Sequence, residues 1–144
     1  MQNSKNKLME YFSSRFGVEK KFWKDLKIHE KGNSLWVTSR NVGLLDRFVA
    51  SGIRALRIMD YGFKPTTYIL QLLNKEVRKN IVDLASEELK ILLFDRERID
   101  TDLSKGYVAL KHGGDVIGCG LIDSKGLKTQ VSKGLTKELI EIIR

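Results

Sequence analysis

The feature that most constrains the fold is a glycine turn between two apolar runs late in the chain. Residues 107–111 and 116–122 are short and largely apolar, and a turn with Gly113 and Gly114 separates them. Two such runs around a Gly-Gly pair predict an antiparallel β-hairpin. A second turn at residues 123–126 precedes another strand-like run at residues 127–131, so this region is predicted to be β-rich.

The first third of the chain predicts helix and then hairpin. Leu8, Phe12 and Phe16 recur at helical spacing, which predicts an amphipathic helix over residues 4–16 that ends at Gly17. Further predicted elements are a short helix around Phe22, Trp23 and Leu26, a hairpin of residues 26–29 and 35–38 around a turn at 30–33, and helical periodicity over 42–50.

Residues 52–59 alternate apolar and basic side chains, which predicts a strand. Its inward side chains are expected to be Ile53, Ala55 or Leu56, and Ile58, and its arginines point outward. The alternation slips at Ala55-Leu56, which leaves the register open.

The middle of the chain combines helical and extended patterns. Pro65 suits the first turn of a helix that continues through Leu73, with Thr66 or Thr67 as a cap. Further predicted elements are a strand or entry segment at 80–84, a helix opening at 86–89 and a final helix at 137–143. The chain is predicted to form a front α/β unit and a β-rich unit, with the boundary between them near residues 75–82. No flexible linker is expected at this boundary.

Charge is unevenly distributed along the chain. Residues 1–79 hold 16 Lys and Arg against 7 Asp and Glu, a net +9, whereas residues 80–144 hold 10 against 11, a net −1. Clustered positive charge attracts nucleic acid and releases its condensed counterions. The alternative is a basic surface that serves only solubility.

Length and composition exclude several classes of protein. The 144 residues include no apolar run near the roughly 20 that a membrane helix needs. No signal-peptide pattern follows the polar N-terminus, so we expect a cytoplasmic protein without membrane contact. The single cysteine, Cys119, and the two histidines lack metal-ligand spacing, and we expect neither metal nor cofactor.

Residues 106–120 and 127–134 resemble the PUA-like domain that ends the Nol1/Nop2/Fmu group of RNA cytosine methyltransferases. The resemblance rests on three short motifs, which are Gly106-Tyr107-Val108, Gly118-Cys119-Gly120 and Leu127-Lys128. It extends upstream through residues 16–18, 36–37, 52–57 and 64–68, and the chain is similar to a stand-alone archaeal form of this extension. Two positions depart from the family pattern: Ser132 stands where the family often has proline, and Cys119 stands where it often has a bulkier residue between the glycines.

This resemblance implies an α+β fold in two units. Residues 1–77 form a basic α/β pre-PUA domain, packed on a PUA-like mixed β-barrel of residues 78–144 that binds RNA. Gly118 and Gly120 suit a strand that bends sharply in a small barrel and approaches another backbone closely. The methyltransferase domain itself is missing, with no glycine-rich cofactor loop and no paired catalytic cysteines, so no catalytic activity is expected.

The candidate RNA-binding residues form two sets. Arg54, Arg57 and Lys64 are the most concentrated basic group of the front unit, because arginine pairs phosphate bidentately and stacks on bases. The alternative is surface salt bridging with Asp60 or Glu76. On or beside the predicted barrel strands lie Lys111, Lys128, Gln130 and Lys133, of which Gln130 is placed to bind a base edge and the lysines to contact phosphate.

Other reactive side chains are expected to be structural. Cys119 lies in an apolar strand, which favours a buried thiol over a nucleophile. His29 has no second histidine at ligand spacing. Asp95, Glu97, Asp100 and Asp102 are interpreted as a solvated face, since spacing alone shows no converging ligands for a cation.

The sequence leaves three functions open. The first is an RNA-binding protein of rRNA maturation and ribosome biogenesis, with rRNA or alternatively tRNA as its partner. The second is a substrate-binding subunit that acts in trans with a separate RNA cytosine methyltransferase. The third is a protein-interaction module that docks on a ribosomal protein through exposed aromatics such as Trp23 or Trp36.

Overall fold

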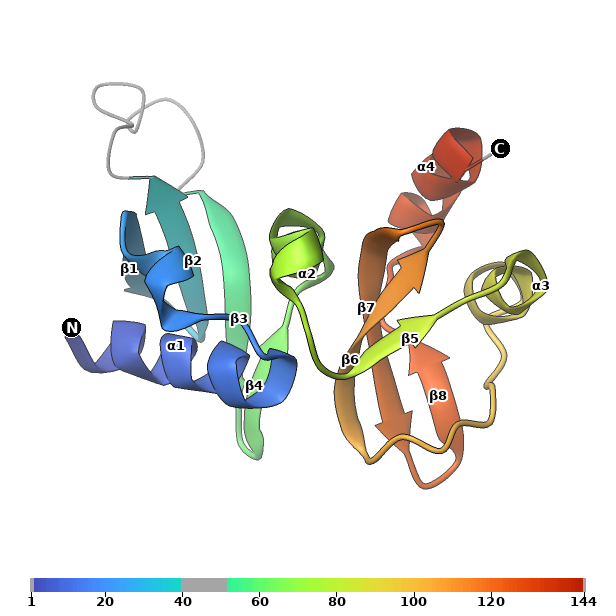
Figure 1. The fold of residues 1–144 in the computed structure, drawn as a ribbon, viewed down its shortest axis with the longest axis horizontal. Helices are drawn as coiled ribbons and strands as arrows, with labels where there is room; N and C mark the ends of the chain where they lie inside the picture. Colours follow the sequence, from blue (N-terminus) through green and yellow to red (C-terminus); the bar gives the residue numbers. More distant parts are fainter. Residues whose placement is uncertain (1, 40–51, 144) are drawn as a thin grey trace.

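The computed structural model describes residues 2–39 and 52–143 and shows a mixed α+β fold with two four-stranded sheets (Figure 1). The front sheet consists of β1 (Leu26–Lys31), β2 (Ser34–Ser39), β3 (Ile53–Met59) and β4 (Gly62–Pro65). The back sheet consists of β5 (Ile81–Asp83), β6 (Gly106–His112), β7 (Asp115–Asp123) and β8 (Gly126–Thr129). The helices are α1 (Gln2–Phe16), α2 (Thr67–Leu73), α3 (Ser86–Leu89) and α4 (Lys133–Ile143), with 3-10 turns at Lys20–Trp23 and Asn74–Glu76 and a π-helical turn at Lys90–Phe94.

Both sheets keep their strands in chain order. The front sheet is antiparallel throughout, whereas β5 runs parallel to β6 and the rest of the back sheet is antiparallel. A bridge between Ile99 and Leu127 lengthens the back sheet beyond β8. Among the described strands each sheet is open, with β5 and β8 at the two edges of the back sheet.

The front sheet packs on α1 through an aromatic core. Leu8, Phe12 and Phe16 follow one another at four-residue spacing and are fully buried, as is Trp23. Phe12 and Trp23 have ring centroids 5.2 Å apart. Gly17 ends the helix with a φ of +68°, which glycine adopts without strain, and its N–H donates to the carbonyl of Ser13.

The end of α1 also fixes the passage from the front to the back sheet. The N–H groups of Arg78 and Lys79 donate to the carbonyl of Phe16, and Asn80 Nδ2 donates to the carbonyl of Arg15. Arg15 Nε in turn donates to the carbonyl of Tyr107 at 2.7 Å. The connection is therefore bound to the helix terminus and not a free linker.

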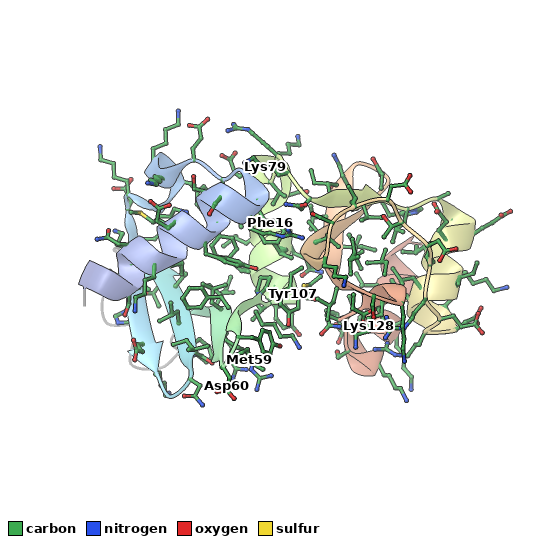
Figure 2. All side chains as sticks on the ribbon, turned by 90° about the horizontal axis from the view of Figure 1, so that it is seen from below. Phe16, Met59, Asp60, Lys79, Tyr107 and Lys128 are labelled. Atoms are coloured by element: carbon green, nitrogen blue, oxygen red, sulfur yellow. The ribbon has the colours of Figure 1, made fainter. Side chains whose placement is uncertain are left out.

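The back sheet is covered on both faces. Tyr107, Ala109 and Cys119 join the front core, whereas Val108 and Leu110 belong to a second apolar cluster with α3, the π-helical turn and α4. Figure 1 shows α2 between the two sheets and α3 and α4 on the outer side of the back sheet. In Figure 2, Phe16 and Tyr107 lie where the two halves of the molecule meet.

Several predicted details are wrong. Pro65 ends β4 instead of opening a helix, because its inward position opposite Leu56 buries the ring. Ile58 is 37% exposed, since it lies near the hairpin tip beyond the cover of the core. The second short helix stops at Trp23, and Leu26 already begins β1.

Most of the other predicted helices and strands are present in the structure. The predicted first helix, the two hairpins and the strand at 52–59 are confirmed. The final helix begins earlier than expected, at Lys133. The helical periodicity over 42–50 lies outside the described residues. Within the described ranges, no helix has both the length and the apolar character needed to cross a bilayer.

Candidate functional site

A β-bulge places the two candidate arginines on one face of the front sheet. Arg54 lies opposite Trp36 and Arg57 opposite Ser34, and the register shifts between these pairs because Ala55 is an extra residue. Residues three apart in a regular strand point to opposite faces, so without the bulge the arginines would diverge. The slip at Ala55-Leu56 in the sequence is this bulge.

Lys64 extends the basic group of β3 onto the neighbouring strand β4. It lies opposite Arg57, which in turn lies opposite Ser34, and directly opposed residues project from the same face. Within the part of the chain that the structure describes, no carboxylate lies within 4.0 Å of Arg54, Arg57 or Lys64. The alternative prediction of ion pairs with Asp60 or Glu76 is therefore wrong for these conformations.

An aromatic side chain lies among these cations. The guanidinium carbon of Arg54 is 5.2 Å from the ring centroid of Trp36, within cation–π distance. Trp36 also lies opposite His29, whose Nε2 is 3.1 Å from Thr38 Oγ1. Trp36 is partly buried and Arg54 is exposed, so the pair presents a flat cationic surface to solvent.

The basic face forms one wall of a groove of about 800 Å³ between the two sheets. Strands β3 and β4 supply the basic residues, α2 supplies the floor, and the other lining residues come from the segment after β8 and the start of α4, with Cys119 of β7 beneath them. The lining residues are Trp36, Gly52, Ile53, Arg54, Arg57, Lys64, Pro65, Thr66, Thr67, Tyr68, Gln71, Leu72, Cys119, Gln130, Ser132 and Leu135. None of these is acidic.

Helix α2 is held in the groove by hydrogen bonds to both sheets. Thr66 Oγ1 accepts the N–H of Ile69 at 3.2 Å, which caps the helix, and it donates to the carbonyl of Arg54. Cys119 N donates to Thr67 Oγ1 at 3.2 Å, and Gln71 Nε2 donates to the carbonyl of Ile117 at 2.9 Å. The groove thus has a fixed floor.

Cys119 is a structural thiol at the bottom of this site. Burial raises the pKa of the thiol to about 12, and the nearby positive charge of Lys64 only partly offsets that rise. At neutral pH the side chain is therefore uncharged and a poor nucleophile. This agrees with the sequence interpretation of a buried thiol.

The structure brings together four of the seven predicted RNA-binding residues. Arg54, Arg57, Lys64 and Gln130 line the groove, although they come from both halves of the chain. Gln130 reaches it because its N–H pairs with the carbonyl of Cys119 at the end of β8.

The other three predicted residues lie elsewhere. Lys111 lies in β6 between Asp83 and Val116, and Lys128 lies opposite Leu121. Lys133 lines a separate hollow of about 550 Å³ with Arg96 and Lys137 among its neighbours. None of the three is among the residues of the groove.

Sequence reasoning missed the aromatic and apolar part of the groove. Tyr68 is 57% exposed and Leu72 is 50% exposed, both on the solvent side of α2. The signal was present, because Tyr68 and Leu72 are four residues apart while Ile69, Leu70 and Leu73 form the buried side. Only the position of α2 between two sheets makes that apolar stripe part of a site.

The acidic segment after α3 is solvated, as expected. Asp95, Glu97, Asp100 and Asp102 are all exposed. Among the described residues, no group of three or more His, Cys, Asp or Glu side chains is placed to hold a metal ion.

No protein-family model matches this chain, and no curated protein matches it at a significant level.

Proposed function

We propose that the protein binds RNA in the groove between its two sheets. The observation that carries the proposal is the lining: Arg54, Arg57 and Lys64 share a hollow with the amide of Gln130 and with aromatic rings, and none of its described lining residues is a carboxylate. Cations that have no ion pair among the described residues are available to phosphate, and their charge attracts a polyanion at long range. The amide and the rings supply the groups that contact bases.

The distribution of charge along the chain also supports a polyanionic ligand at the basic wall of the groove. The net +9 of residues 1–79 belongs to the half that forms the basic wall, whereas residues 80–144 carry −1. A purely solubilising surface does not require cations to converge on one concave site.

The wider role is proposed from the resemblance to the PUA-like extension of RNA methyltransferases. On that proposal residues 1–77 and 78–144 are a pre-PUA and a PUA-like domain, and the open back sheet with the Ile99 segment corresponds to a PUA-like barrel. The protein then acts in the cytoplasm in rRNA maturation, as a binding protein without catalytic activity.

A salt titration tests the RNA proposal. Binding of a fluorescent mixed-sequence RNA is measured by anisotropy at increasing salt for the wild type and for the double variant Arg54→Ala/Arg57→Ala. Each lost phosphate contact is expected to make the slope of log K against log salt shallower by about 0.7, and the double variant is expected to bind about tenfold more weakly at low salt.

A matched control separates this groove from net charge alone. Lys90→Ala/Lys105→Ala removes the same charge from exposed positions outside the groove. If both double variants lose affinity equally, the RNA is attracted by overall charge and the groove is not its site. If the wild type binds no RNA at low salt, the proposed function is wrong.

Crosslinking in the native cells tests the wider role. RNA attached to the wild type is sequenced and compared with that attached to an Arg54→Ala/Arg57→Ala/Lys64→Ala variant. Enrichment of an rRNA segment that the variant loses supports a role in ribosome biogenesis, whereas enrichment of tRNA or of no defined RNA contradicts it.

A further inference from the structure

An exposed aromatic ring, that of Tyr68, lines the groove together with the cations. Tyr68 is 57% exposed, although the next two residues, Ile69 and Leu70, are fully buried. The ring of Trp36, by contrast, already has the guanidinium of Arg54 within cation–π distance. Tyr68 is therefore the groove's uncovered aromatic surface, and an uncovered ring beside cations is the arrangement on which nucleobases stack.

The size of the groove selects what can enter it. A hollow of about 800 Å³ falls within the roughly 300–1,000 Å³ of pockets that enclose ligands of drug size. A nucleobase with its ribose fits such a space, whereas an RNA duplex does not. In a duplex the faces of the bases are also stacked on one another, so they are not available to Tyr68.

The two groove amides point to the same conclusion. Gln71 Nε2 donates to the carbonyl of Ile117, and Gln130 Nε2 donates to the carbonyl of Thr129 at 3.2 Å. A backbone carbonyl only accepts, which fixes the nitrogen side of each amide and leaves its oxygen as an acceptor. Among the described residues neither oxygen has a donor. Base N–H groups are the matching donors, and in a duplex they are engaged in pairing.

We infer that the groove takes unpaired RNA nucleotides, with a base stacked on Tyr68 and the backbone phosphates on Arg54, Arg57 and Lys64. This inference rests on the proposed function and specifies its ligand as single-stranded RNA. The amides of Gln71 and Gln130 bind the exposed base edges, and the neighbouring Leu72 and Leu135 exclude water from the stacked base.

The test compares an unstructured RNA strand of about 12 nucleotides, within the site sizes of single-strand binders, with a hairpin of the same base composition. The wild type is expected to bind the strand at least about tenfold more tightly than the hairpin stem, since only the strand offers a base for stacking. Equal or tighter binding of the hairpin overturns the inference while leaving RNA binding itself intact. Failure of both RNAs to bind overturns the proposed function instead.

Variants of Tyr68 test the stacking contact. Tyr68→Ala is expected to weaken binding of the strand about 5- to 150-fold, whereas Tyr68→Phe keeps the ring and changes affinity by less than about twofold. Tyr61→Ala is the matched control, because Tyr61 is 72% exposed and lies outside the groove. Unchanged affinity in Tyr68→Ala, or equal losses in the Tyr61 and Tyr68 alanine variants, overturns the inference.

Fluorescence reports base entry independently of affinity. The chain has two tryptophans, of which Trp23 is fully buried and Trp36 lines the groove. Addition of the strand is expected to quench the emission of the wild type, and Trp36→Phe is expected to abolish most of the quenching. Binding without any quenching places the RNA outside the groove.

Discussion

The two sheets of this protein have the same number of strands but opposite surroundings. The front sheet buries one face on α1, and its other face carries the exposed Arg54 and Arg57. Its first strand, β1, lies at the edge of the sheet and is largely exposed. In the back sheet, β6 and β7 are buried almost continuously because apolar clusters cover both faces. On the proposed function, this difference corresponds to a back sheet that is a rigid support and a front sheet that carries the binding face.

The groove lies where these two environments meet. Its basic wall belongs to the face of the front sheet that carries Arg54 and Arg57, and its other side is formed by residues at the rim of the buried back sheet. A site built on rigid elements holds its side chains in place more accurately than one built on loops. Substitutions in the back sheet should therefore cost stability, whereas substitutions on the basic wall should cost binding.

The largest expected effect is on the core of the back sheet. Leu110→Ala removes a fully buried side chain from the outer cluster and should lower the free energy of unfolding by about 2–5 kcal/mol. Urea denaturation measures this. Leu72→Ala, on the half-exposed side of α2, is the control and should cost well under that range. Similar losses at both positions would contradict a difference in burial.

Adding a single methyl group to β7 should have the next largest effect. A Cβ on Gly118 would collide with the side chain of Val131, so Gly118→Ala should destabilise the protein by about 1–3 kcal/mol. Gly134 lies in α4 with open space around it, and Gly134→Ala should stabilise the protein by up to about 1 kcal/mol. Thermal unfolding of the two variants should shift in opposite directions, and a shift in the same direction would contradict the packing around β7.

Local patterns were enough to predict the hairpins and the first helix. Alternation and the Gly113-Gly114 pair specify β6 and β7, and the spacing of Leu8, Phe12 and Phe16 specifies α1. These signals are local because turn geometry and side-chain periodicity involve near neighbours only. The need for Gly118 and Gly120 was also visible, but its reason differs, since neighbouring side chains and not another backbone occupy the space.

The composition of the groove could not be predicted in full because it depends on tertiary contacts. Gln130 and Lys128 are two residues apart, yet only Gln130 lines the groove. Pro65 and Thr66 are adjacent, yet one ends a strand and the other caps a helix, which the sequence assigned to a single helical segment. Such outcomes depend on how α2 packs between the sheets, and that arrangement is fixed by long-range contacts.

A smaller effect is expected where α2 is joined to the front sheet. Thr66→Ala removes the cap on Ile69 N and the bond to the carbonyl of Arg54, and it should cost about 0.5–2 kcal/mol. Thr66→Ser retains the hydroxyl and should restore most of the stability. The alanine variant should also bind RNA more weakly, because the floor and the basic wall lose their shared contact. A loss of stability with unchanged affinity would show that this contact does not position the site.

The last effect is absent at neutral pH and arises only in alkali, where the buried thiol of Cys119 ionises. Because burial raises the pKa of Cys119 to about 12, the unfolded chain releases this proton at lower pH than the folded protein does. The contribution of this thiol to the free energy of unfolding is therefore fully present below about pH 9, and it is lost as the pH rises toward 12. Burial also raises the pKa values of Tyr11 and Tyr107, so Cys119→Ala should make the alkaline loss shallower without abolishing it. Urea denaturation between about pH 8 and 11 measures the slope, and an unchanged slope in the variant would mean that the thiol ionises as readily in the folded protein as in the unfolded chain.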